Sequence, residues 1–298
     1  MRAADGVAKP FSSPAATPVP AAPAAFPGRL DREGTHDSLP AGMDETLQLR
    51  VHGDPAAPAL VYLPGIHGDW TLAGGFRAAL AGAVRFVEFT YPRTLTWTLA
   101  GYAAAVEEAL LAAGVRSGWV LAESFGSQVV WPLVAEARAF RAGGLVLAGG
   151  FGRHPLRRTA GACRRVCASL PLAWLHGALR WYARAARFRY RRSPQTLADL
   201  AEFVARRTEA DRRAAVHRLD LIAANDPAAL AARFAGPVHY LSGLADPVVP
   251  WPLVPPWLRR HSPGYRGMRL VARADHAVLA TAPGPSAALV LRCMAGRG

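Results

Sequence analysis

The stretch WVLAESFGS, residues 119–127, decides the fold. Its first four residues form a short apolar run that predicts a buried parallel strand, and a helix is predicted to begin directly after Ser124. A serine on a sharp turn between a strand and a helix forms a nucleophile elbow. Such a turn brings together the residues two positions before and after the serine, and both Ala122 and Gly126 are small. The alternative interpretation is that Ser124 only caps the helix.

Strands and helices are predicted to alternate on both sides of this stretch. Strands are predicted over residues 46–52, 59–63, 85–89, 119–122 and 144–148, and helices over 70–81, 98–114 and 127–137. This alternation predicts an α/β fold with a mostly parallel central sheet and helices on both faces. The strand at 46–52 alternates polar and apolar residues, as a half-buried edge strand does.

The alternation stops between residues 152 and 235, where helices alone are predicted. Proline follows a capping residue at Ser193-Pro194 and Asp226-Pro227, and each pair predicts a helix start. Strands resume over 238–242 and 268–271, and a last helix is predicted over 285–295. We therefore predict a core of residues 41–151 and 236–298 that is interrupted by a helical cap, residues 152–235.

The first 40 residues differ in composition from the rest. They are rich in proline and alanine and poor in large apolar side chains, so we predict a disordered tail, residues 1–40. Prolines begin before any continuous apolar h-region, which argues against a signal peptide. No apolar run approaches the about 18 residues of a membrane-spanning helix. We expect a cytoplasmic protein.

A nucleophilic serine needs a base, and His276 is the histidine best placed to provide one. It follows the last predicted strand, in the segment ADHA, residues 274–277. His239 lies inside a predicted strand and His261 in a predicted proline-rich loop. A surface-loop histidine is the alternative for His276.

The base in turn needs a carboxylate that fixes its tautomer. The acid is expected just after one of two late strands. No Asp or Glu occurs from residue 137 to residue 198, which excludes one of these two positions. The segment GLADPVVP offers Asp246 just after the strand at 238–242, which gives the chain order Ser, Asp, His. Glu123 and Asp275 are rivals, but each adjoins another member of the set and is expected to point away.

Two backbone N–H groups are needed to stabilise an oxyanion. One is expected from Phe125, directly after the serine, and the other from the loop LPGIHGD, residues 63–69. In this loop Ile66 is the first choice and His67 the second. A purely structural turn is the alternative for this loop.

The motifs together resemble those of the α/β-hydrolase superfamily, in its cap-bearing branch of esterases, lipases and small-molecule hydrolases. The L-P-G-x-H-G loop, the A-E-S-F-G elbow, the G-L-A-D-P-V-V-P segment and the D-H segment match in order and spacing over about residues 45–297. The resemblance implies a serine hydrolase that needs no cofactor and no metal. Its expected substrate is a carboxylic ester or thioester of a small to medium apolar molecule. Hydrolysis of C–C or amide bonds, acyl transfer, and a non-catalytic hydrolase-fold binding protein remain alternatives.

Charge and cysteine content add little to this interpretation. The net charge is +14, but 34 of the 35 basic residues are arginines and Lys9 is the single lysine, a bias typical of GC-rich coding. We therefore expect a small-molecule substrate and no nucleic-acid partner. Three cysteines form neither a disulfide framework nor a zinc motif. The oligomeric state is left open.

The predicted cap is rich in arginine and aromatic residues. Four arginines share one helical face: Arg180, Arg184, Arg187 and Arg191. An apolar stripe lies on another side: Leu172, Leu175, Leu179 and Tyr182, with Trp174, Trp181 and Phe188 nearby. One interpretation is a lid whose basic face meets an anionic membrane surface or substrate. The other is a packed helix with a solvated basic face.

Overall fold

The computed structural model describes residues 46–169, several residues between 173 and 187, and residues 194–297. The predicted tail, residues 1–40, lies outside the described residues. So do Leu172, Leu175, Leu179, Phe188 and Arg191 of the predicted cap faces. Of the arginines on the predicted basic face, Arg180, Arg184 and Arg187 are exposed, and so are Trp174 and Trp181.

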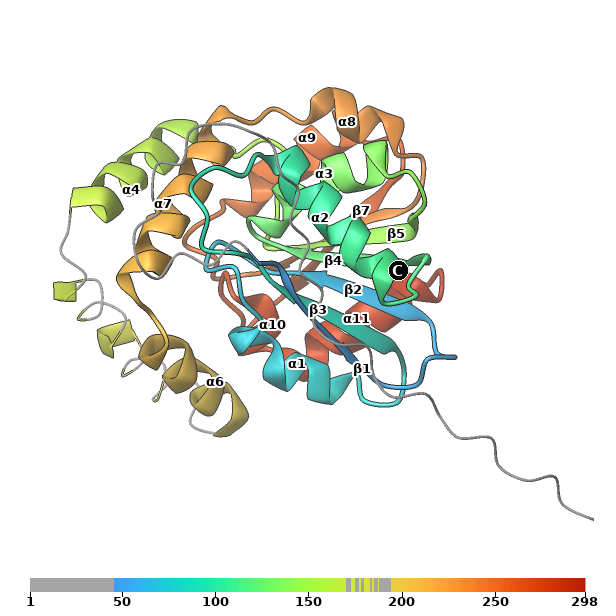
Figure 1. Ribbon diagram of the computed structural model, residues 1–298, viewed down its shortest axis with the longest axis horizontal. Coiled ribbons are helices and arrows are strands. Elements are labelled where there is room, and N and C mark those ends of the chain that lie inside the picture. Colours follow the sequence, from blue (N-terminus) through green and yellow to red (C-terminus); the bar gives the residue numbers. More distant parts are fainter. Residues whose placement is uncertain are drawn as a thin grey trace, which may run out of the picture. The chain divides into compact units, whose positions relative to one another are not determined.

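A seven-stranded sheet in the order β1-β3-β2-β4-β5-β6-β7 forms the centre of the fold (Figure 1). Its strands are β1 (Gln48–His52), β2 (Ala59–Leu63), β3 (Arg85–Thr90), β4 (Ser117–Glu123), β5 (Arg141–Ala148), β6 (Val238–Gly243) and β7 (Tyr265–Val271). The edge strand β1 runs antiparallel to β3, and every other pair is parallel. The predicted α/β fold with a mostly parallel sheet is confirmed.

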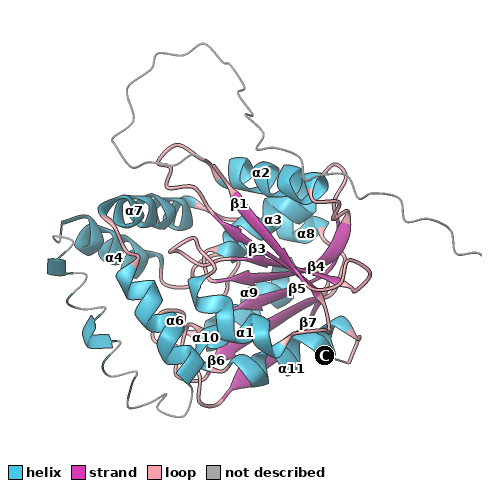
Figure 2. Cartoon of the chain, turned by 60° about the horizontal axis from the view of Figure 1, so that its bottom comes forward, coloured by secondary structure: helices cyan, strands magenta, loops and turns pink. Residues whose placement is uncertain are grey.

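Helices cover both faces of the sheet (Figure 2). One face carries α2 (Leu99–Ala112), α3 (Gly126–Glu136), α8 (Ala228–Arg233) and α9 (Val254–His261), and the other α1 (Gly74–Ala79), α10 (Val278–Thr281) and α11 (Pro283–Met294). Strand β2 contributes to both layers, since Val61 and Leu63 face the α2–α3 side while Leu60 and Tyr62 face the α1–α11 side. Burial on both faces explains why this strand is a continuous apolar run.

Helices also follow β5, where the sequence predicts the cap. They are α4 (Arg157–Ser169), α6 (Pro194–Ala205), α7 (Glu209–Ala224) and α8, and no strand is described between β5 and β6. Helices α4 and α7 lie side by side, and α6 lies apart from them on the same side of the molecule (Figure 1). Helix α6 packs against α1, and a hydrogen bond of 3.0 Å from the Gly75 N–H to the buried Asp199 carboxylate joins the two helices. The division of the chain into core and cap domains stays a prediction.

Several element boundaries differ from the prediction. Helix α6 begins at Pro194 as predicted, but α8 begins at Ala228, so Pro227 precedes that helix. Strand β5 begins three residues before the predicted range, and β7 also begins three residues early, because their first residues are partly exposed and give no apolar signal. The placement of His261 in a loop is wrong, since it is the last residue of α9.

Candidate active site

Ser124 lies on the turn between β4 and α3, in a strained backbone conformation. Its φ of +47° is the single positive φ among the described residues other than glycine. Such a left-handed conformation costs an L-residue about 1–2 kcal/mol, and strain of this kind concentrates at functional sites. The Ser124 N–H donates a hydrogen bond of 3.0 Å to the Ala148 carbonyl at the end of β5, which ties the turn to the neighbouring strand.

The turn also needs a residue without a side chain two positions later. A Cβ atom on Gly126 would lie 2.4 Å from the Leu63 carbonyl oxygen, closer than real contacts allow. The end of β2 and the start of α3 therefore approach each other closely at the serine. The strand, strained serine and helix form the geometry that the elbow motif predicts.

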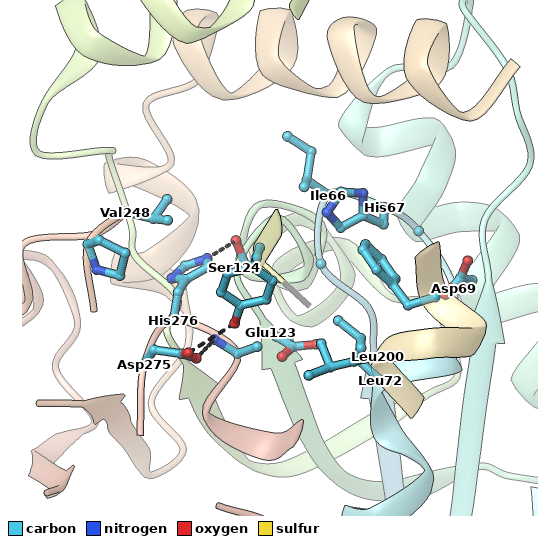
Figure 3. Close-up of a pocket in the computed structure, with 16 residues that line it drawn as sticks. Ile66, His67, Asp69, Leu72, Glu123, Ser124, Leu200, Val248, Asp275 and His276 are labelled. Carbon is cyan, nitrogen blue, oxygen red and sulfur yellow. Dashed lines mark hydrogen bonds between the residues drawn. The ribbon is translucent and has the colours of Figure 1, made fainter. Parts of the chain in front are cut away.

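The side chains of Ser124, His276 and Asp246 are joined by hydrogen bonds (Figure 3 draws the first two). The Ser124 Oγ lies 2.9 Å from His276 Nε2, and His276 Nδ1 lies 2.8 Å from Asp246 Oδ2. The serine and the histidine are 152 positions apart in the chain, so the fold alone brings them together. In this arrangement the imidazole can take a proton from the serine while the carboxylate fixes its tautomer.

Backbone donors hold Asp246 in place. Its Oδ1 accepts hydrogen bonds from the Val248 N–H at 2.8 Å and the Val249 N–H at 2.9 Å, which leaves Oδ2 for the histidine. The Asp246 side chain is fully buried. Hydrogen bonds to both oxygens satisfy the buried carboxylate and orient it.

Glu123 and Asp275, the rival acids, bond elsewhere. The Tyr62 hydroxyl donates to Glu123 Oε2 at 2.5 Å, and the Tyr182 hydroxyl donates to Asp275 Oδ2 at 3.0 Å. Among the described residues neither carboxylate bonds to His276. Both nevertheless line the pocket, which the sequence did not predict.

The loop after β2 forms a tight turn above the serine. The Gly68 N–H donates to the Gly65 carbonyl at 2.9 Å, so Ile66 and His67 are the central residues of the turn. Within the described part of the chain, the N–H groups of Ile66, His67 and Phe125 donate no hydrogen bond to protein atoms. These N–H groups are the predicted oxyanion donors, and the choice between Ile66 and His67 stays open.

The Ser124 and His276 side chains line a pocket of about 250 Å³. Apolar residues from separate segments form much of its wall: Ile66, Leu72, Leu200, Phe203, Pro247, Val248 and Ala277. Leu200 and Phe203 come from α6, so this helix contributes apolar side chains to the pocket wall (Figure 3 labels Leu200). Sequence reasoning missed these two residues, because the apolar pattern of a helix does not indicate which side chains reach the pocket.

Three ionisable groups in the pocket wall, those of Glu123, His67 and Asp69, have shifted pKa values. Burial raises the pKa of the Glu123 carboxyl, although the hydrogen bond from Tyr62 has the opposite effect. Burial, followed by the charge of Arg207, lowers the pKa of His67 to about 3, so this imidazole is neutral at pH 7. Burial alone would raise the pKa of Asp69, but the ion pair with Arg207 holds it below its usual value. Shifted groups beside a nucleophile are typical of active sites.

The described part of the chain contains no group of three or more His, Cys, Asp or Glu side chains that could hold a metal ion. None of its helices is long and apolar enough to cross a bilayer.

No family model and no curated protein matches the sequence. Solved structures do match. A hydrolase from Pseudomonas aeruginosa has 18% identity and a TM-score of 0.68, and the match covers 86% of this chain and 99% of that one. A thermophilic esterase from Thermogutta terrifontis has 16% identity and a TM-score of 0.64, with 86% and 98% covered. An alpha/beta hydrolase from a Medee basin deep-sea metagenome has 14% identity and a TM-score of 0.66, with 85% and 94% covered.

These similarities extend over most of each chain. Together with the sheet order and the strained elbow at Ser124, they show that the protein has the α/β-hydrolase fold. The resemblance inferred from the motifs is thereby confirmed at the level of the fold. At this low sequence identity the reaction has to be argued from the site itself.

Proposed function

We propose that the protein is a serine hydrolase that cleaves carboxylic esters or thioesters through an acyl-enzyme intermediate. One observation carries the proposal: the hydrogen-bonded chain of Ser124 Oγ, His276 and Asp246 opens into an apolar pocket. A non-catalytic binding protein would not need all three side chains in this order.

The first half of the proposed reaction forms the acyl-enzyme. Ser124 Oγ attacks the substrate carbonyl carbon while its proton moves to His276 Nε2, and the carbonyl oxygen becomes an oxyanion. The Phe125 N–H and an N–H of the turn at residues 65–68 stabilise this oxyanion. His276 then gives the proton to the leaving alkoxide or thiolate as the C–O or C–S bond breaks. Asp246 stays ionised and stabilises the imidazolium.

The second half releases the acid. His276 takes a proton from a water molecule as the water oxygen attacks the acyl carbon, and the same oxyanion donors act again. The proton then returns to Ser124 Oγ when its bond to the acyl carbon breaks. Neither half requires a cofactor.

The pocket favours a neutral acyl group of small to medium size. Its volume is about 250 Å³ and its wall is largely apolar. The carboxyl groups of Asp69, Glu123 and Asp275 lie in the wall, whereas no arginine is among the described lining residues. The predicted steering of anionic substrates by the basic face, and its association with anionic membranes, stay predictions.

Two measurements test the proposal. A fluorophosphonate probe should label the wild-type protein and the Ser169→Ala variant, in which an exposed helical serine is removed, but not Ser124→Ala. Among p-nitrophenyl esters of graded chain length, short and medium acyl groups should be preferred, and Ser124→Ala should lower kcat by several orders of magnitude. A wild-type protein that takes no label and hydrolyses no ester would refute the proposal and favour a binding role.

A further inference from the structure

Arg218 of α7 has its side chain deep in the core, with 1% of the residue exposed. Its Nη1 donates a hydrogen bond of 2.8 Å to the Ile66 carbonyl, and its Nη2 donates one of 2.9 Å to the Pro92 carbonyl. A helix from the segment after β5 therefore holds the turn that follows β2, 152 positions away in the chain.

The Arg218 charge has no carboxylate partner among the described residues, whereas two other arginines near the site do have one. Arg207 is paired with Asp69, and Arg93 bonds to Asp211 at 2.7 Å. Around Arg218 there are instead carbonyl oxygens, the Tyr102 hydroxyl at 3.5 Å, and aromatic rings. A buried charge without a carboxylate partner is costly, so the hydrogen bonds to the Ile66 and Pro92 carbonyls are needed to stabilise it.

The Arg218 guanidinium lies close to both segments that carry the predicted oxyanion donors. The Arg218 guanidinium carbon lies 6.0 Å from the centre of the Phe125 ring, and the Phe125 N–H is one predicted donor. Its bond to the Ile66 carbonyl holds the turn that carries the other donor. The field also reaches the pocket wall: burial, the Arg207 charge and then the Arg218 charge lower the pKa of His67, against the opposite effect of Asp69.

The turn is shaped around the guanidinium. Gly68 has a φ of +78°, and a Cβ atom there would lie 2.4 Å from Arg218 Nη1. Because the peptide bond between Ile66 and His67 is trans, the His67 N–H points away from the carbonyl that Arg218 binds. The hydrogen bond therefore fixes the orientation of this peptide plane as well as its position.

We propose that Arg218 is a positioning residue for the oxyanion site: it fixes the turn at residues 65–68 through the Ile66 carbonyl and places a positive charge without a described carboxylate partner close to this turn and to the Phe125 side chain. The proposal rests on the serine-hydrolase function argued above. It predicts that Arg218 acts on the transition state, in which the oxyanion exists, more than on the bound substrate.

The test compares Arg218→Met, Arg218→Lys and Arg93→Met with the wild type. Arg93→Met removes a different contact between α7 and the core, the one to Asp211, and serves as the matched control for docking of α7. The assays are kcat and KM for a short p-nitrophenyl ester, melting temperature, and the Kd of a phenylboronic acid. The boronic acid forms a tetrahedral anionic adduct with a nucleophilic serine and so reports on the oxyanion site.

Arg218→Met should lower kcat about 10- to 100-fold and weaken boronate binding by a similar factor, with KM changed less than about twofold. Arg218→Lys should recover part of both losses, because an ammonium can still donate to one carbonyl and keeps the charge. Arg93→Met should keep kcat and boronate affinity close to wild type. If Arg218→Met does not fold, the lysine variant decides alone, with an expected loss of kcat and boronate affinity at unchanged KM.

Three results would overturn the inference. One is a folded Arg218→Met with wild-type kcat and boronate affinity, and the second is an equal loss in Arg93→Met. The third, if only the lysine variant folds, is wild-type kcat and boronate affinity in that variant. A wild-type protein without esterase activity or fluorophosphonate labelling would instead refute the proposed function, and the inference with it.

Discussion

Substitution of Gly126 by alanine tests the close approach at the elbow, and Gly101 provides a matched control. Both glycines lie in helices, Gly126 in α3 and Gly101 in α2. A Cβ atom on Gly101 would lie 3.5 Å from Thr98 Oγ1, an ordinary contact. A Cβ atom on Gly126 would lie 2.4 Å from the Leu63 carbonyl oxygen, about 1 Å short of the 3.4 Å at which ordinary contacts begin.

The two substitutions should therefore change stability in opposite directions. Gly101→Ala should raise the free energy of unfolding by about 0.5–1 kcal/mol, because alanine loses less backbone entropy in a helix. This corresponds to a rise in Tm of about 2–4 °C per kcal/mol in a domain of this size. Gly126→Ala gains the same helical preference but overpacks a backbone contact, at a cost of about 1–3 kcal/mol. The net result is a loss of up to about 2.5 kcal/mol.

Activity should separate the variants more clearly than stability. To admit the methyl group, the end of β2 must move away from α3 by about 1 Å, which displaces the loop with Ile66 from Ser124. A shift of this size can cost about 100-fold in kcat/KM. We would measure Tm by circular dichroism and kcat/KM with p-nitrophenyl butyrate. A Gly126→Ala variant that keeps wild-type kcat/KM, or whose Tm rises as in Gly101→Ala, would refute the reasoning.

Two further predictions concern the carboxyl groups of the site. Asp246→Asn should keep the backbone hydrogen bonds to Oδ1 but face His276 Nδ1 with an amide, which favours the wrong tautomer, so kcat should fall about 10⁴-fold at little cost in Tm; a loss under tenfold would contradict the role of Asp246. Burial raises the pKa of Glu123, so the folded state holds this proton more tightly than the unfolded state, and stability falls as pH rises from the unfolded pKa through the folded one. Glu123→Gln should remove that fall, which thermal melts between pH 4 and pH 9 would measure. A variant whose Tm declines with pH as steeply as that of the wild type would contradict this prediction.

The central part of the fold was predictable because its sequence signals are local. Strands buried on both faces, such as 59–63, must be continuous apolar runs, and the elbow requires small residues at fixed spacing around Ser124. The ends of β5 and β7 and the whole of α9 were not predicted. Their residues are partly exposed or rich in proline, and proline in the first turn of α9 is tolerated there because the missing N–H would be unbonded anyway.

Chain order and elimination led from Ser124 to Asp246 and His276, and the structure brings these three side chains within hydrogen-bonding distance. Their catalytic roles stay predictions. What the sequence could not indicate are contacts that depend on docking of the helices after β5. Neither the apolar wall from Leu200 nor the bond from Arg218 to the loop after β2 follows from any local pattern, since both join segments that are far apart in the chain.

The pairing of β5 with β6 has a consequence for what activity measures. Four residue pairs join these strands, from Leu145 with Val238 to Ala148 with Leu241. Ser124 and the proposed oxyanion donors lie on the β1–β5 side of this strand pair, whereas Asp246 and His276 follow β6 and β7 on the other side. Local separation of β6 from β5 would move the serine away from its base while β1 to β5 keep their pairing. Turnover therefore depends on whether β5 and β6 are paired, and loss of activity and global unfolding need not coincide.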